Sequence, residues 1–506
     1  MDYISVRTAT ENWGISERRV QKLCEQGRVP GAQRFGHYWI LPKDAQKPED
    51  QRLTPEKEKP AHKPRPKDRK PLSMLREAWE LKTHGLDEQF DALLQELLPL
   101  VKARQDERSL YGEWLFLSSF RHHPHLSEMT AVLKEAVPYF NGKCSRVILP
   151  SSLFPFASLS VFSVYHTELG NAQEEARLLE KYITLYSSLT GGHGTAADIS
   201  FRAEMLFYCG DLNTSEILAY KALYSAQEKE QATIVLSSAL QLGNIALCKG
   251  DADGWQRAID AMSLAYKDSE CSATVRSMVD AMRGILLLEL THPDVIAHWL
   301  KAGDFERLRP LPQLLPFAHF VHAQFLCRKG EFARLIGFAE ARYPNGIEAS
   351  PVLDTLMSLT VASAYLNMGD KAKAEMLIQH AADRALPDSL VFPFVSYIQL
   401  LGGLLDAVVK KSYPACAPAY LKIKSQLNLA GRRLSQHIVT ITKTNALPDD
   451  LTFKEREVAL LAAQGLRNTE IAQRLSVTEN TVRYHLRSVF HKLDVDRRIK
   501  LAEKLL

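Results

Sequence analysis

Two arginines near the end of the chain, Arg483 and Arg487, stand four residues apart, and Tyr484 lies beside the first. Residues at this spacing share one face of a helix, so a helix here would present both guanidinium groups, the phenol ring and Asn480 to the same side. An arginine can donate two hydrogen bonds to the O6 and N7 atoms of guanine, the commonest specific contact in the DNA major groove. The pattern predicts base reading. The alternative for a lone helix is a solvated charged face.

Three helices are expected to position this face. Thr452 and Glu455 form a capping-box pattern at the start of the first helix, which Gly465 ends. Asn468 can cap a second helix and, after a three-residue turn, Thr478 can cap the third. A helix, a tight turn and a helix with an arginine-bearing face form a helix-turn-helix. The apolar stripe of the third helix is Val482, Leu486, Val489 and Leu493.

Residues 451–506 resemble the LuxR-type (GerE-like) helix-turn-helix family. Two departures are mild: Lys454 stands where the family usually has arginine, and Arg467 where a small polar residue is common. The matching positions are Leu451, Thr452, Glu455, Glu457, Val458, Gly465, Asn468, Glu470, Ile471, Ala472, Leu475, Thr481, Val482, His485, Lys492, Leu493, Val495 and Arg497.

The resemblance implies roles for particular residues. Arg483, Tyr484 and Arg487 occupy positions that enter the major groove, and Asn480 is exposed beside them. Small polar side chains at helix N-termini hold phosphates without reading sequence, and the positions expected to do so are Asn468, Thr469 and Thr481. The segment 497–506 matches the family's dimerisation helix, which implies a homodimer on double-stranded DNA.

The first 45 residues carry a second pattern of the same kind. Ser5 can cap one helix, and Ser16 can cap another after a turn. The exposed face of the second helix carries Arg18, Arg19 and Lys22. Aromatic and β-branched residues then flank the turn at Gly36-His37, which predicts a small β-hairpin.

A helix-turn-helix followed by a hairpin resembles the MerR/excisionase-like winged domain, and the likeness extends from Tyr3 to about Pro42. It implies that Arg18, Arg19 and Lys22 face the major groove, while Arg34 and His37 on the wing contact the DNA backbone or the minor groove. The alternative is a small adaptor domain that uses this fold to bind a protein partner.

Between the ends, residues 46–71 are rich in proline and lysine and are expected to be a linker. Residues 72–441 show helical patterns almost throughout. A glycine followed by a polar residue recurs at steps of 40, 40, 80 and 39 residues, which predicts stacked helical hairpins in a solenoid. The marks are Gly170-Asn171, Gly210-Asp211, Gly250-Asp251, Gly330-Glu331 and Gly369-Asp370, with a break at Thr291-His292-Pro293 in place of the skipped mark.

The segment Ala-Tyr-Leu-x-x-Gly-Asp-x-x-x-Ala from Ala364 resembles the tetratricopeptide family, although the period is longer. Similar long-helix arrays occur in large MalT-like regulators. Such repeats can bind peptides, proteins or small ligands on a concave surface. The alternative is a scaffold that spaces and dimerises the DNA readers. No phosphate-binding Gly-x-x-x-x-Gly-Lys-Ser/Thr motif is present, so the chain departs from MalT-like regulators in lacking their ATPase signature.

Charge and cysteine content agree with a DNA-binding protein of a reducing compartment. The net charge is +4; residues 1–45, 46–71 and 449–506 carry +2, +4 and +2, and the remainder carries −4. This distribution favours phosphate neutralisation near the ends. The 7 cysteines are scattered without metal-ligand spacing, and no apolar run reaches the length that spans a bilayer. We expect a cytoplasmic protein without metal, cofactor or enzymatic activity.

The sequence therefore predicts an all-α chain with four parts. These are a winged helix-turn-helix at 1–45, a linker at 46–71, a tetratricopeptide-like solenoid at 72–441, and a LuxR-type domain at 449–506. The expected function is sequence-specific transcriptional regulation, with a signal or partner sensed by the solenoid. In the alternative, a protein-interaction scaffold, only the C-terminal domain binds DNA and the N-terminal domain binds a protein.

Overall fold

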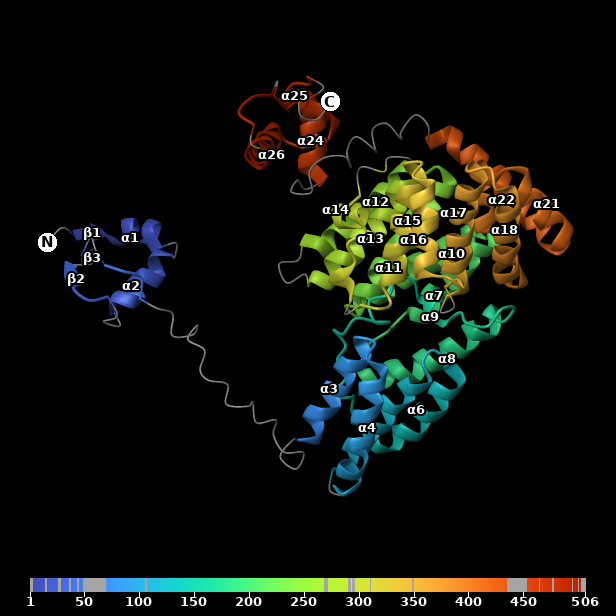
Figure 1. Cartoon of the computed structure of the whole chain (residues 1–506), viewed down its shortest axis with the longest axis horizontal. Coiled ribbons are helices and arrows are strands. Elements are labelled where there is room, and N and C mark those ends of the chain that lie inside the picture. The colour runs from blue at the N-terminus through green and yellow to red at the C-terminus, as the bar shows by residue number, and fades with distance from the viewer. Residues whose placement is uncertain are drawn as a thin grey trace. The chain divides into compact units, whose positions relative to one another are not determined.

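The computed structural model is mostly helical. It describes residues 3–13, 16–25, 29–35, 38–42, 45–48, 70–104, 107–267, 272–289, 293, 296–309, 311–347, 350–434, 453–463, 465–475, 477–493, 495–498 and 500–501. The described residues between 3 and 48 belong to a compact unit separate from the remainder of the chain. Figure 1 shows the N-terminal unit, the helical body and the C-terminal helices, whose positions relative to one another are not determined.

The N-terminal unit combines two helices with a small antiparallel sheet. Its elements are β1 (Tyr3–Ser5), α1 (Val6–Trp13), α2 (Glu17–Glu25), β2 (Gln33–Phe35) and β3 (Tyr38–Pro42). The predicted hairpin is present, because β2 pairs with β3. Strand β1, which the sequence analysis did not predict, pairs with the other edge of β3. Ser5 both ends β1 and caps α1, since its Oγ accepts a hydrogen bond from the Thr8 amide at 3.2 Å.

A single small core holds this unit together. The fully or almost fully buried apolar residues come from α1, α2, β3 and the loop that precedes β2, and they form one cluster. They are Ala9, Val20, Leu23, Cys24, Val29 and Leu41.

Residues 70–434 form a body of stacked helices, labelled from α3 to α22 in Figure 1. The long helices pair as antiparallel neighbours, such as α17 with α18 and α11 with α12. The α-helices are α3 (Pro71–Thr83), α4 (Asp87–Lys102), α5 (Arg108–Ser119), α6 (Leu126–Phe140), α7 (Val161–Tyr165), α8 (Ala172–Thr190), α9 (Ala197–Cys209), α10 (Leu212–Glu228), α11 (Ala232–Lys249), α12 (Ala252–Lys267), α13 (Ala273–Glu289), α14 (His298–Ala302), α15 (Leu315–Arg328), α16 (Phe332–Arg342), α17 (Pro351–Asn367), α18 (Lys371–Ala385), α19 (Phe392–Ser396), α20 (Ile398–Leu401), α21 (Gly403–Ser412) and α22 (Ala417–Leu434).

The recurring glycine marks join consecutive helices as predicted. All five glycines adopt a left-handed conformation, with φ between +70° and +89°, which glycine enters without steric cost. The following aspartate caps the next helix in three cases. Asp211 accepts from the Thr214 amide at 3.2 Å, and Asp370 accepts from the Lys373 amide at 3.1 Å. Asp251 accepts from the Gly254 amide at 2.9 Å. Residues 290–292, where the sequence breaks the period, lie outside the described residues.

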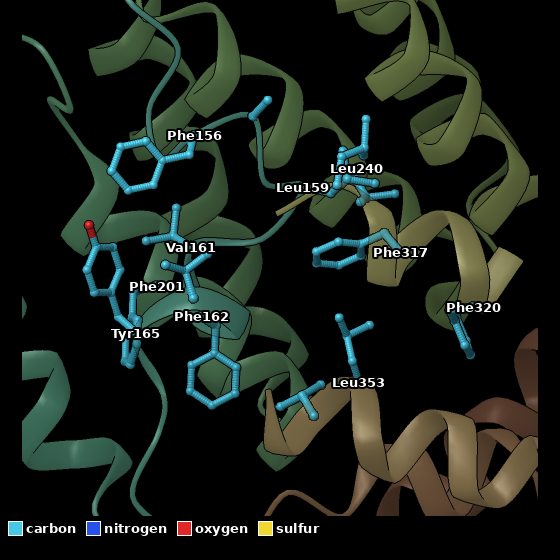
Figure 2. Packing of buried hydrophobic residues seen from close by; sticks show 14 of the residues in the cluster. Phe156, Leu159, Val161, Phe162, Tyr165, Phe201, Leu240, Phe317, Phe320 and Leu353 are labelled. Atoms are coloured by element: carbon cyan, nitrogen blue, oxygen red, sulfur yellow. The ribbon is translucent and has the colours of Figure 1, made fainter. Parts of the chain in front are cut away.

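The body also closes on itself through contacts between distant segments. Helix α22 packs on α11, and α19 packs on α9, where the rings of Phe207 and Phe392 have centroids 4.2 Å apart. Figure 2 shows a second meeting point, in which Phe162 of α7 lies near Leu353 of α17, with Phe317 of α15 in the same cluster. A simple repeat array has contacts between neighbours alone. This body adds contacts that join its later helices α17, α19 and α22 to α7, α9 and α11.

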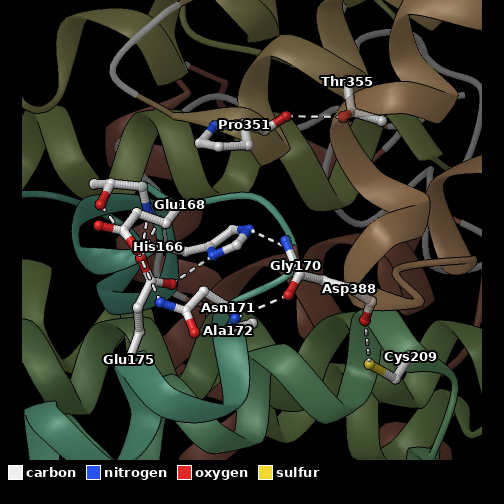
Figure 3. Close-up of polar contacts among 11 residues, drawn as sticks. His166, Glu168, Gly170, Asn171, Ala172, Glu175, Cys209, Pro351, Thr355 and Asp388 are labelled. Carbon is white, nitrogen blue, oxygen red and sulfur yellow. Dashed lines mark hydrogen bonds and ion pairs between the residues drawn. The ribbon is translucent and has the colours of Figure 1, made fainter.

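Buried polar residues reinforce this closure. Asp388, which follows α18, accepts hydrogen bonds from the amides of Gly170 and Ala172 at 2.6 and 2.8 Å. Its Oδ2 lies 3.5 Å from Nε2 of His166, whose Nδ1 is 2.6 Å from Glu175. Figure 3 shows these residues converging at the start of α8. The three side chains of His166, Glu175 and Asp388 are almost completely buried, whereas Gly170 at the edge of the contact is exposed.

Helix α11 corrects one sequence expectation. Its 18 residues have a mean hydropathy of 1.3, so by length and composition it could cross a membrane. In the structure 72% of that window is buried, because α11 packs against α9, α10, α12, α13 and α22. Its apolar character therefore matches a central core helix.

Candidate DNA-binding interface

The C-terminal domain contains α24 (Phe453–Ala463), α25 (Asn468–Arg474) and α26 (Glu479–Lys492). Gly465 ends α24 with φ of +89°. The predicted cap of α26 is present, because Thr478 Oγ1 accepts from the Thr481 amide at 3.2 Å. The predicted apolar stripe is also confirmed. It is buried against α24 and α25 and consists of Val482, Leu486, Val489 and Leu493.

The opposite face of α26 is open to solvent. Asn480, Arg483, Tyr484 and Arg487 are all exposed. Tyr484 is 72% exposed, more than any other large apolar side chain among the described residues. Aromatic residues and arginine are enriched at interfaces, so this combination of side chains suits a surface that a partner covers.

The two arginines differ in their present partners. Arg483 Nη2 forms an ion pair with Glu479 Oε1 at 2.6 Å, one turn earlier on α26. Arg487 forms no ion pair with any described residue. Arg487 is therefore ready to donate to an acceptor outside the chain, whereas Arg483 must first leave Glu479.

The residues expected at phosphates lie at the starts of α25 and α26. Thr469 is exposed, and Thr481 Oγ1 lies 2.8 Å from Thr478 Oγ1. Asn468 is half-buried, and its Oδ1 has no hydrogen-bond partner in the described part of the chain. Helix N-termini place free amides and a positive dipole end where an anion can bind.

Asn468 does not cap α25 as the sequence predicted. The cap position is Arg467, whose amide donates to Glu470 Oε2 at 2.6 Å. The reason is the position of Glu470 three residues later, from which its carboxylate reaches back to the free amide. Asn468 thus becomes the first residue of the helix.

Glu455 has a role that the sequence analysis missed. Its expected capping partner, Thr452, lies outside the described residues. The Glu455 side chain is buried and accepts from Ser488 Oγ at 2.5 Å and from Lys492 Nζ at 2.8 Å. These bonds fix α26 against α24. The contacts span 33 and 37 residues, so no local spacing rule could have indicated them.

The N-terminal site residues are described in part. Arg18, Arg19 and Lys22 lie on α2, and Lys22 is exposed. Arg34 lies on β2 opposite Trp39 of β3. The side chains of Arg18, Arg19 and Arg34, and all of His37, lie outside the described residues. The structure therefore places these residues on a helix and a hairpin but does not show what the side chains contact.

The adjacent histidines at 122, 123 and 125 do not assemble a metal site. Burial lowers the pKa of His123 to about 3, and its ring lies 5.2 Å from that of Phe156 and 5.6 Å from that of Tyr165. No group of three or more His, Cys, Asp or Glu side chains with metal-binding geometry occurs among the described residues. His123 is partly exposed and packs against the Phe156 and Tyr165 rings.

The comparison with protein families decides the nature of the C-terminal domain. Residues 449–505 match the model of bacterial regulatory proteins of the luxR family. These residues form a luxR-family helix-turn-helix domain. The match covers about a ninth of the chain and includes α24, α25 and α26.

Similar curated proteins are named as regulators. The chain is 38% identical over 77 residues to the "Probable transcriptional regulatory protein SgaR" of Hyphomicrobium methylovorum, covering 15% of this chain and 36% of that protein. It is 38% identical over 121 residues to the "Transcriptional regulatory protein LiaR" of Bacillus subtilis, covering 23% and 56%. The chain thus spans between about a third and just over a half of these two relatives.

A third similarity extends beyond the luxR-family domain. The chain is 28% identical over 144 residues to the "HTH-type transcriptional regulator AlkS" of Ectopseudomonas oleovorans, covering 28% of this chain and 15% of that protein. An alignment of this length must include residues before 449, because the matched domain ends one residue before the end of the chain. Part of the preceding sequence is therefore similar to a larger regulator.

Proposed function

We propose that the protein is a sequence-specific DNA-binding transcriptional regulator. The observation that carries the proposal is the exposed face of α26 within a luxR-family domain, where Arg487 has no ion-pair partner among the described residues. A recognition helix in the major groove presents such side chains to base edges. The relatives named above are themselves called transcriptional regulators.

Within this function, we assign base contacts to Arg483, Tyr484 and Arg487, with Asn480 at their edge. Phosphate contacts fall to Asn468, Thr469 and Thr481. These residues lie at the starts of α25 and of α26 itself, and α25 packs on α26, so the phosphate contacts would fix the orientation of α26 on the duplex. Dimerisation through residues 497–506 would place two copies on half-sites about one helical turn apart.

The N-terminal unit is proposed to be a second DNA reader, and the helical body is proposed to sense a signal. The N-terminal unit, with two helices and a hairpin, supports a winged reader of the MerR/excisionase-like kind. The glycine-punctuated helices of the body support a tetratricopeptide-like array that binds a signal or a partner protein. Such a regulator acts in the cytoplasm and needs no catalytic group.

The alternative is a protein-interaction scaffold in which only the C-terminal domain binds DNA. The specific observation in its favour is that the family match covers only residues 449–505. The two proposals differ in the role of the N-terminal unit.

Binding-site selection from random DNA separates them. The selection uses the full chain, residues 72–506 and residues 1–448. If the full chain selects a composite site and each truncation loses one half, both ends read DNA. If the site survives removal of residues 1–71 and is lost without residues 449–506, the scaffold proposal is supported. Failure of the full chain to enrich any sequence would exclude both.

A further inference from the structure

A groove opens on the surface of the body between α16 and α18. Helix α16 packs on α15 and α17, and α18 packs on α17 and α21, so α17 forms the floor between the two. The resulting cavity has a volume of about 440 Å³, within the range of sites that hold small organic molecules. We call this cavity the α16–α18 groove.

The middle of the groove is apolar. Met357 and Val361 form its floor, and Leu377 and Met376 come from α18. Met376 is 63% exposed and lines the groove. Methionine adapts its shape to different apolar partners, so its position at the edge suits a surface that closes over a bound molecule.

One end of the groove carries Lys373, whose ammonium group lies in the field of the Glu340 and Asp370 carboxylates without forming an ion pair with either. Lys373 Nζ lies 4.6 Å from the centroid of the Tyr365 ring and 3.4 Å from its hydroxyl oxygen. The Tyr365 hydroxyl donates a hydrogen bond to the Glu340 carboxylate. Lys373 forms no ion pair with the described residues. Its hydrogen bond to Tyr365 raises the pKa of Lys373, so the ammonium group stays charged at neutral pH.

The other end of the groove is already neutralised. The buried Asp354 accepts from the Ile347 amide at 2.9 Å, and its Oδ2 lies 2.8 Å from His380 and 3.1 Å from Arg384. Asp354 and Tyr365 are eleven residues apart on α17, which corresponds to about 16 Å along the helix. The groove therefore offers an apolar stretch with the Lys373 ammonium at one end, where the Glu340 carboxylate is held by the Tyr365 hydroxyl.

We propose that the α16–α18 groove binds a small, mostly apolar molecule that carries one anionic group. The anionic group pairs with Lys373, and the apolar part lies over Val361 and Leu377 beneath Met376. An ion pair fixes the orientation of the molecule, and removal of apolar surface from water supplies most of the affinity. Binding of the molecule does not depend on the proposed function. The idea that binding regulates transcription rests on that function.

The test uses the full chain and 8-anilinonaphthalene-1-sulfonate, an apolar aromatic probe with one sulfonate. Fluorescence titration measures its dissociation constant and stoichiometry. The groove variants are Lys373→Glu and Met376→Asp. Their matched controls are Lys371→Glu, an exposed lysine of α18 that pairs with Glu375, and Met368→Asp, an exposed methionine outside the groove. All four residues are exposed, so the variants should fold, which circular dichroism checks.

We expect one saturable site per chain, weakened about tenfold by each groove variant, which corresponds to about 1.4 kcal/mol. The controls should change the dissociation constant by less than about twofold. Absence of saturable binding, or equal weakening in the controls, overturns the proposal. The affinity of each variant for a selected DNA site is measured without the probe. This measurement tests the proposed function independently of the groove. If the probe does not bind in the groove but the protein still binds its DNA site, the groove proposal is wrong and the proposed function is unaffected.

Discussion

Arg487 is the side chain of α26 whose charge is most available to DNA. We predict that Arg487→Ala weakens binding to a selected site by about 10- to 100-fold, because a bidentate arginine–guanine contact contributes about 1–3 kcal/mol of discrimination. The preference for guanine at one position should also relax. Fluorescence anisotropy on the selected site and on single-base variants measures both effects. Arg177→Ala on α8, an exposed arginine paired with Glu174, is the control and should change neither.

His193 makes part of the body's stability depend on pH. It is buried, with Nδ1 2.7 Å from the Tyr186 hydroxyl and Nε2 3.0 Å from the Ser152 carbonyl oxygen. These contacts satisfy a neutral ring, in which Nε2–H donates and Nδ1 accepts. Burial lowers the pKa of His193 to about 4 from the usual 6.5. Between pH 4 and pH 6.5, this histidine therefore binds a proton in the unfolded chain but not in the folded chain.

We predict that the His193 contribution to stability is fully present above pH 6.5 and is lost as the pH falls toward 4. The slope from this group is about 1.4 kcal/mol per pH unit. His193→Gln should remove this part of the dependence. Urea unfolding of both proteins at several pH values between 7 and 4.5 measures it. Parallel stability curves for the two proteins would show that His193 does not contribute.

At the scale of elements, the glycine marks are not equivalent. A Cβ atom on Gly210 would lie 1.8 Å from Cδ1 of the buried Ile423 of α22, whereas a Cβ on Gly369 would meet nothing within 4 Å. The two glycines have φ of +89° and +87°. Gly369→Ala should cost roughly 1 kcal/mol from backbone strain alone.

We predict that Gly210→Ala costs the same strain plus roughly 1–3 kcal/mol for overpacking against Ile423. The excess should appear as a lower urea midpoint and as faster hydrogen exchange in α22. Because the two substitutions share the backbone conformation and the following aspartate, equal losses would refute the proposed contact between α22 and the end of α9.

Elements with a local signal could be predicted from the sequence. The stripe of α26, the Thr478 cap and the glycine marks depend on spacings of a few residues, which periodicity and capping rules capture. Strand β1 was missed because three residues carry little pattern and it pairs with a strand nearly forty residues later. The contacts of Glu455 with Ser488 and Lys492 were missed because these partners lie on another helix. The cap at Arg467 was missed because Glu470, rather than the cap residue, supplies the hydrogen bond.

At the scale of the whole body, closure depends on contacts that no repeat pattern contains. Asp388 accepts hydrogen bonds from the amides of Gly170 and Ala172, which lie more than two hundred residues earlier in the sequence. A repeat period predicts which helices are neighbours, but it does not predict that the last helices return to α9 and α11. This geometry follows from the summed packing of many helices, so the sequence alone left the body as an open array.

We predict that Asp388→Ala lowers the free energy of unfolding by about 2–4 kcal/mol, because two backbone amides and His166 lose a buried partner. Hydrogen exchange should increase over residues 166–175. The control is Asp370→Ala, which removes a carboxylate that caps α18 locally and should cost about 1 kcal/mol. A loss at Asp388 no greater than that at Asp370 would show that the closure contributes little.

The central claim is that α26 reads guanine in the major groove. Methylation interference on the selected site, with the full chain, tests it directly, because dimethyl sulfate adds a methyl group to N7 of guanine, where arginine donates. We expect methylated guanines in two half-sites about one helical turn apart to block binding. Binding that tolerates methylation at every guanine of the site would contradict it.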